Sequence, residues 1–190
     1  DNAIFRVRRM SDGAMTDLVT RTVSIDKTAP SGSVTVDTNV WKELLNTISF
    51  GLFFNKTQEA EIIAEDSVSG VASIGYVVST EAMELSDLKL QTWTVYTKPV
   101  ELAADGKYVV YVKVTDNAGN ISYLGTDGMV IDTVAPVVNG IEDGRTYEGE
   151  IVFTVVEDYI DFVSINGETV TGVQHMLRPR DQIQTIVVRD

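Results

Sequence analysis

An internal repeat constrains this chain more than any other feature of its sequence. Residues 4–30 and residues 108–136 follow one pattern: an alternating apolar run, an Asp-containing turn, a second apolar run and an Asp-x-x-Ala-Pro ending. A third copy begins at residues 185–190, TIVVRD, which match residues 111–116, YVKVTD. Because a repeat of this kind reflects one structural unit used several times, we expect a chain of related modules.

The repeat divides the 190 residues into three parts. Residues 1–30 match only the end of a unit, so we expect them to form the C-terminal hairpin of a preceding module. Residues 31–135 hold one complete unit, and residues 136–190 hold a unit that lacks its last strand. The Asp-x-x-Ala-Pro junctions leave almost no flexible linker, which predicts stiff connections between the units.

Each copy has the alternation that is typical of a half-buried β-strand. In residues 108–114, YVVYVKV, the residues Val110, Val112 and Val114 share one face of the strand, and Lys113 lies on the other. β-branched residues, which fit a pleated surface, make up about a third of the chain, with 28 Val, 14 Ile and 20 Thr. The sequence therefore predicts an all-β protein built from antiparallel β-sandwiches.

Turn signals separate the expected strands. Asp116-Asn-Ala-Gly-Asn120 concentrates residues that favour turns, and Asn166-Gly167 is the pair preferred in a two-residue hairpin turn. The strands are expected at 33–37, 47–54, 58–65, 71–79, 92–96, 99–102, 107–115 and 128–132, and in the last unit at 137–141, 150–157, 160–165, 173–177 and 183–189. Two short helical insertions are expected in the middle unit, over 39–45 and 80–90, from their apolar spacing.

Composition excludes several kinds of chemistry. The chain has no Cys and one His, His175, so it offers neither disulfides, nor thiol nucleophiles, nor metal sites with several His ligands. Its net charge of −13 disfavours nucleic acid, which is bound through clusters of Lys and Arg. No apolar run approaches the roughly 20 residues that cross a bilayer. We therefore expect no catalytic activity, no nucleic-acid partner and no membrane insertion.

The turn and junction motifs resemble a known family. D-N-A-G-N at 116–120, D-K-T-A-P at 26–30, D-T-V-A-P at 132–136 and D-S-V-S-G-V at 66–71 look like the bacterial immunoglobulin-like modules. Such modules stand in tandem in large secreted and cell-surface proteins. The resemblance implies an extracellular or cell-surface location, and spacing, display, or binding of glycans or host proteins as the function. It also implies neighbouring modules of the same polypeptide as partners.

Oxygen-rich side chains near the expected strand ends suggest a calcium site, since calcium binds about six to eight oxygens at flexible spacing. The alternative is that these side chains only cap their own turns. The candidate ligands are Asp66, Asp116, Asn117, Asn120 and Asp132.

Three aromatic residues are candidates for stacking on a sugar ring: Trp41, Trp93 and Tyr96. Trp93 and Tyr96 are three positions apart, so on one strand they would point to opposite faces. The alternative is that all three pack in or against the core.

The sequence thus favours a non-catalytic spacer or display module. The other hypothesis is an adhesin-type module that binds a glycan or a host protein, or serves as an accessory module to a carbohydrate-active enzyme.

Overall fold

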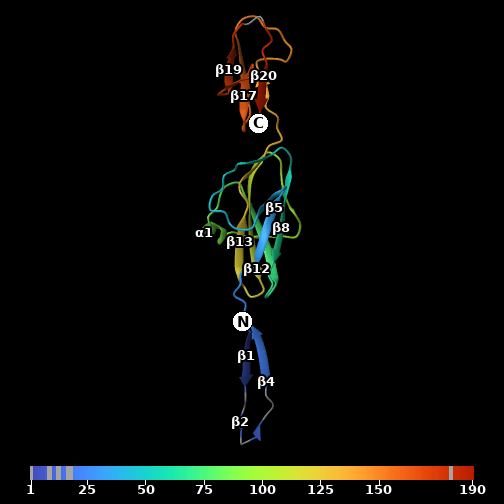
Figure 1. The fold of residues 1–190 in the computed structure, drawn as a ribbon, viewed down its shortest axis with the longest axis vertical. Coiled ribbons are helices and arrows are strands. Elements are labelled where there is room, and N and C mark those ends of the chain that lie inside the picture. Colours follow the sequence, from blue (N-terminus) through green and yellow to red (C-terminus); the bar gives the residue numbers. More distant parts are fainter. Residues whose placement is uncertain (1, 8–9, 12–13, 16–18, 180–181) are drawn as a thin grey trace. The chain divides into compact units, whose positions relative to one another are not determined.

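The computed structural model describes residues 2–7, 10–11, 14–15, 19–179 and 182–190 (Figure 1). The described chain is nearly all β, which confirms the predicted class. It divides into two compact units, Asp1–Thr133 (unit 1) and Val134–Asp190 (unit 2), so this boundary lies two residues before the expected one. The one helix in this part of the chain, α1 (Leu85–Leu88), has four residues, and no described helix could cross a membrane.

Unit 1 begins with a two-stranded hairpin. The strands β1 (Asn2–Val7) and β4 (Val19–Ser24) pair in antiparallel fashion, with Ala3 opposite Val23 and Val7 opposite Val19. Two short strands lie between them, β2 (Met10–Ser11) and β3 (Ala14–Met15), and pair with each other.

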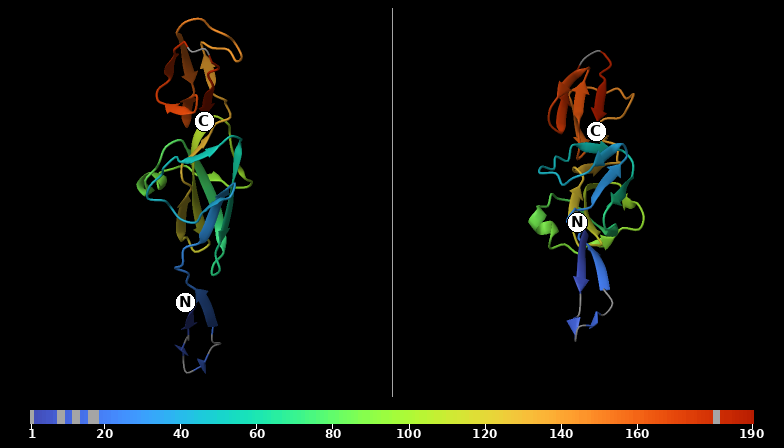
Figure 2. Two further views of the ribbon diagram at one scale, coloured as in Figure 1. Left: turned by 45° about the horizontal axis from the view of Figure 1, so that its top comes forward. Right: turned by 60° about the horizontal axis from the view of Figure 1, so that its bottom comes forward.

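Two sheets form the body of unit 1 (Figure 2). The first has the order β11-β8-β5-β6, and the second has the order β10-β9-β12-β14-β7, with β13 also paired to β12. Their strands are β5 (Ser31–Val36), β6 (Asn39–Trp41), β7 (Leu52–Phe54), β8 (Gln58–Glu65), β9 (Val71–Ser79), β10 (Thr94–Val95), β11 (Val100–Leu102), β12 (Gly106–Asp116), β13 (Ile121–Gly125) and β14 (Met129–Ile131). The described pairs are antiparallel except for β14 with β7, which is parallel.

Alternation along the strands builds the main core of unit 1. The inward residues of both sheets form one cluster: Val34, Val36, Ala60, Ile62, Val100, Leu102, Val110, Val112, Val114, Leu124, Met129 and Ile131. The strands β8 and β9 occupy the predicted ranges 58–65 and 71–79 residue for residue. Burying these aliphatic side chains between two sheets is the main driving force for a fold of this kind.

A second, smaller cluster lies on the outward face of β12. Val109 and Tyr111 are fully buried there together with Leu88 of α1. Segments before β7 and around α1, together with β13, cover them with partly buried apolar side chains: Leu44, Ile48, Phe50, Met83, Trp93 and Tyr123. The central strand of unit 1 is therefore buried on both faces.

The expected helix over 39–45 is wrong. Asn39–Trp41 forms strand β6, and Asn39 pairs with Val36 across a two-residue turn in which Asp37 has a φ of 52°. Asp tolerates this left-handed backbone better than most residues, so the turn keeps the chain in the sheet. The second expected helix, 80–90, is confirmed only as the short α1, and strand β13 was not predicted.

Unit 2 repeats the strand order of unit 1. Its sheets have the orders β15-β16-β19 and β18-β17-β20, which correspond to β5-β8-β11 and β10-β9-β12 of unit 1. Its strands are β15 (Val137–Asn139), β16 (Ile151–Val156), β17 (Phe162–Ile165), β18 (Glu168–Val170), β19 (Gln174–Leu177) and β20 (Ile186–Arg189). The predicted hairpin turn at Asn166-Gly167 joins β17 to β18, with φ values of 55° and 84°.

Phe153, Val155 and Val163 form the buried centre of unit 2. The single histidine, His175, is buried beside them, with its ring 5.1 Å from that of Phe153. The core of unit 2 is much smaller than that of unit 1, in keeping with its shorter chain.

We predict that Tyr96→Phe destabilises unit 1. The Ile62 amide of β8 donates a 3.0 Å hydrogen bond to the Tyr96 hydroxyl, while the Tyr96 amide donates to Ile74 of the other sheet. Removing the hydroxyl leaves the Ile62 amide without this acceptor and is expected to cost about 1–2 kcal/mol. Urea unfolding, followed by tryptophan fluorescence, measures this loss in the free energy of unfolding. Tyr76→Phe is the control, because the Tyr76 ring packs against Tyr96 and its hydroxyl accepts no amide among the described residues. Equal losses in both variants would contradict the role of the Ile62 hydrogen bond.

Candidate metal centre

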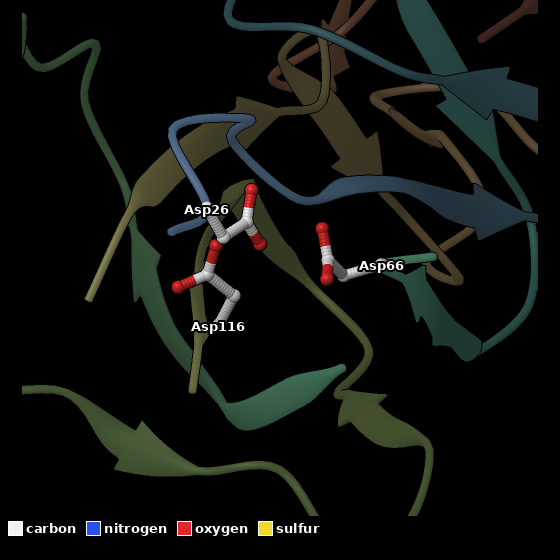
Figure 3. Close-up of side chains that lie close together, drawn as sticks. All are labelled: Asp26, Asp66 and Asp116. Carbon is white, nitrogen blue, oxygen red and sulfur yellow. The ribbon is translucent and has the colours of Figure 1, made fainter. Parts of the chain in front are cut away.

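Three carboxylates meet at one end of unit 1 (Figure 3). Asp26 lies in the segment that enters the sandwich, Asp66 follows β8, and Asp116 ends β12. One oxygen from each carboxylate lies within 4.8 Å of the other two. The strands β8 and β12 end at this side of the unit, so the fold brings together residues that are far apart in the sequence.

Asp66 is fixed by the loop that follows it. Its Oδ1 atom accepts hydrogen bonds from the amides of Val68, Ser69 and Gly70 at 3.1, 2.7 and 2.7 Å. Gly70 has a φ of 80°, a conformation that glycine adopts without strain and that lets the loop close around the carboxylate. Burial alone would raise the pKa of Asp66, but these hydrogen bonds and one from the Ser69 hydroxyl outweigh it and lower the pKa.

Asp116 is fixed in the same way by the turn after β12. Its Oδ1 atom accepts from the amides of Ala118 and Asn120, at 2.9 and 2.8 Å, and its Oδ2 atom accepts from the Asn120 side chain at 2.8 Å. Burial raises the pKa of Asp116, yet the bonds from Asn120, Ala118 and Gly119 prevail and lower it. The residue is only 2% exposed. Both carboxylates are thus held in their charged form at neutral pH.

The entering segment is tied to this turn by side chains of the sandwich. The Asn120 amide group donates to the carbonyl oxygen of Thr28 at 3.1 Å, and the Ser122 hydroxyl donates to that of Pro30. The Asp26 Oδ1 atom accepts from the Thr28 amide at 2.9 Å. Its Oδ2 atom is buried and has no hydrogen-bond partner among the described residues.

These observations fit a hard cation. The potential ligand atoms are carboxylate oxygens, which suit calcium or magnesium rather than the softer metals that prefer nitrogen or sulfur. Three carboxylates at this spacing repel one another unless a proton or a cation lies between them. Because hydrogen bonds lower the pKa of Asp66 and Asp116, a cation is the better way to offset this charge. The buried oxygen of Asp26 offers a further free ligand atom.

The five residues that the sequence suggested as calcium ligands have different roles in the structure. Asp66 and Asp116 lie in the cluster, whereas Asn120 supports it by hydrogen bonds. The Asn117 side chain donates to the carbonyl oxygens of Ser69 and Gly70, at 2.9 and 3.0 Å, and so joins the two loops. Asp132 follows β14, where its amide donates to Phe54, and does not join these three carboxylates.

Asp26 was not among the nominated residues. It occupies the same place in the first Asp-x-x-Ala-Pro motif as Asp132, one of the five suggested ligands, does in the second. The repeat was therefore the signal that pointed to Asp26. It shows that the first Asp of the motif belongs to the entrance of the unit that follows.

The three aromatic candidates lie in two different clusters. Trp41 and Tyr96 pack against the main core between the sheets, whereas Trp93 packs against the outward cluster, with its ring 5.9 Å from that of Tyr123. The structure therefore does not bring the three together on one surface.

Comparisons of the chain with models of protein families, with curated proteins and with solved structures find no match.

We predict that unit 1 loses stability as the pH falls below about 4–5. Asp66 and Asp116 have a lower pKa in the folded state than the ordinary value near 4 that applies when the chain is unfolded. The stability that this difference provides is complete above the unfolded pKa and is lost as the pH falls through the folded one. Urea midpoints measured between about pH 7 and pH 3 test this, with Trp41 and Trp93, both in unit 1, as fluorescent reporters.

Asp66→Asn is expected to reduce this pH dependence, because the amide does not ionise. Glu59→Gln is the matched control, since Glu59 is exposed on β8. If the stability of the Asp66 variant depends on pH as that of the unchanged chain does, Asp66 is not a source of this dependence.

Proposed function

We propose that this chain is part of a non-catalytic spacer or display region, built from tandem immunoglobulin-like β-sandwich modules in a bacterial extracellular or cell-surface protein. Three features support this: the sequence repeat, the same strand order in the two units, and the short Asp-x-x-Ala-Pro junctions. In such a region each module holds its neighbour at a fixed distance. The neighbouring modules are then its main partners.

The observation that carries the proposal is the Asp26–Asp66–Asp116 cluster. A calcium ion held there would link the entering segment to the loops after β8 and β12, and so stiffen the entrance to unit 1. The hydrogen bonds from Asn120 and Ser122 already hold the backbone of this segment in place. Calcium would also neutralise the charge of the three carboxylates.

A weak calcium site would suit an extracellular location. The three carboxylates supply only some of the six to eight oxygens that calcium prefers, so water would complete its shell. Extracellular calcium modules typically bind with dissociation constants of about 0.1–1 mM, which match the calcium concentration outside cells. A site of this strength would be filled outside the cell and empty inside it.

We predict that calcium raises the melting temperature of unit 1. With a dissociation constant of about 1 mM, about 10 mM calcium would stabilise the folded state by about 1.4 kcal/mol. This corresponds to a rise of several degrees for a unit of this size. Asp26→Asn should abolish most of the rise, because it removes one carboxylate charge and the buried oxygen ligand. The measurement is thermal unfolding after treatment with EDTA, with and without added calcium.

Limited trypsin digestion gives a second measurement at the junction itself. Lys27 is exposed and adjoins Asp26, so calcium should slow cleavage after Lys27 and leave cleavage after Lys56, in the β7–β8 loop, unchanged. Asp87→Asn, an exposed carboxylate of α1, is the control variant and should keep the full calcium response. If calcium changes neither the melting temperature nor the rate of cleavage after Lys27, both the calcium site and the proposed stiffening are wrong.

A further inference from the structure

The outward face of the sheet β15-β16-β19 in unit 2 carries no charged side chain. Side chains alternate along a strand, and Phe153, Val155 and Leu177 of this sheet pack in or against the core. The residues that alternate with the inward ones face outward: Val137, Asn139, Val152, Thr154, Val156, Gln174 and Met176. The three Val and the Met are each between 46% and 59% exposed. The sheet therefore presents an exposed surface of apolar and uncharged polar groups, which we call the neutral face.

The equivalent surface of unit 1, the outward face of β5-β8-β11, is acidic. The register shows which positions match, because Val137 pairs with Val156 in unit 2 as Ser31 pairs with Glu65 in unit 1. The matched positions along the central strands are Val156 with Glu65, Thr154 with Ile63 and Val152 with Glu61. Both Glu side chains are exposed. The fold itself therefore does not require apolar residues at these positions, and their presence in unit 2 indicates an interaction surface.

The neutral face is arranged in three rows that run across the strands. The register puts Val137 beside Val156 in the first row and Val152 beside Met176 in the third. The middle row consists of Asn139, Thr154 and Gln174. Amide and hydroxyl groups both donate and accept hydrogen bonds, so each of these side chains can pair with a copy of itself. A polar row thus lies between two apolar rows.

This arrangement is self-complementary. In an isologous contact, a two-fold axis brings the same surface of two copies together. With the middle rows aligned, an axis along the strands places each apolar row on its own copy, and an axis across the strands places it on the other apolar row. In both cases apolar groups meet apolar groups, and Thr154 stays at the centre. No charged side chain of the neutral face is buried between the copies, so the contact has no large desolvation cost.

The size of the face limits the strength of such a contact. Three strands about 4.8 Å apart, each with about six residues at 3.3 Å per residue, give a face of roughly 300 Å². Two copies would bury roughly 600 Å² in total, less than the roughly 1,200–2,000 Å² of a stable complex. Unit 2 also has 4 basic and 10 acidic residues, a net charge of −6, so two copies repel each other. The contact should therefore be weak, and salt should strengthen it by screening the repulsion.

We propose that the neutral face of unit 2 binds the neutral face of a second copy of this chain. The two sheets would pack face to face about 10 Å apart, as the sheets of a sandwich do. The product is a reversible dimer with a dissociation constant of about 0.1–1 mM. A two-fold contact uses the neutral face of both copies, so the assembly stops at two chains. The matching face of unit 1 does not take part, because Glu61 and Glu65 would bring like charges together.

Sedimentation equilibrium of chain 1–190, from about 10 µM to about 1 mM, measures this association. We expect the average mass to rise with concentration toward that of two chains, and to rise further when the salt concentration is increased from about 0.05 M to about 0.5 M. A chain that is still monomeric at about 1 mM in the higher salt would overturn the proposal. An average mass above that of two chains would overturn the two-fold contact.

A double substitution tests whether the neutral face is the surface involved. Val152→Glu with Val156→Glu gives unit 2 the acidic residues that unit 1 has at the matching positions, so the sheet should still fold. It should weaken association at least about tenfold, because charges would be buried without partners. The control is Val40→Glu with Ile63→Glu, which adds the same charge at exposed positions of unit 1 and should leave association unchanged. Circular dichroism checks that both variants are folded. Equal association of the two variants would overturn the assignment of this face.

Chemical cross-linking tests the centre of the contact independently. The chain has no Cys, so a single introduced thiol is the only one that reacts. Thr154→Cys places it at the centre of the neutral face, and Ile63→Cys places it at the matching position of unit 1. A bis-maleimide that spans about 10 Å, the spacing of packed sheets, should link the Thr154 variant into dimers much faster than the Ile63 variant. Equal rates of dimer formation would contradict a contact centred on Thr154.

Discussion

The burial of strand β12 on both faces is the constraint on which the rest of unit 1 depends. Its inward residues complete the core between the sheets, and Val109 and Tyr111 on its outward face need a cover of their own. The segments before β7 and around α1 provide that cover. The two insertions in the sandwich therefore have a structural reason, and Trp93 belongs to this cover. The end of the same strand also fixes Asp116 at the candidate metal centre.

Strand alternation made much of the fold predictable from the sequence. The ranges 58–65 and 71–79 were predicted to the residue, because polar and apolar positions alternate clearly there and turn residues bound them. The stretch 39–45 has apolar spacing that fits a helix, but the turn at Asp37 and pairing with β5 override this local preference. Strand β13 is short and mixed in character, so only its pairing with β12 defines it.

The candidate metal centre was predictable in part. Asp66 and Asp116 stand in recognisable turn motifs, and their strands end side by side in the sandwich. The participation of Asp26 depends on where the entering segment lies, and this is set by bonds from Asn120 and Ser122 across more than ninety residues of sequence. Such long-range contacts leave no local pattern. For Asp26 the sequence repeat was the available signal. Its use required knowing that the first Asp of the junction motif belongs to the entrance of the unit that follows.

The position of β14 at the end of unit 1 also affects how the unit folds as it is made. Synthesis releases the chain from its N-terminus, so β5, β8 and β9 emerge well before Met129 and Ile131. The core between the sheets is complete only when these last residues are in place, paired with β12 and with the distant β7. Long-range pairing of this kind is slow, and the unfinished sheets expose apolar strands meanwhile. Residues 1–128 carry a net charge of −6, which would keep nascent chains apart during that interval.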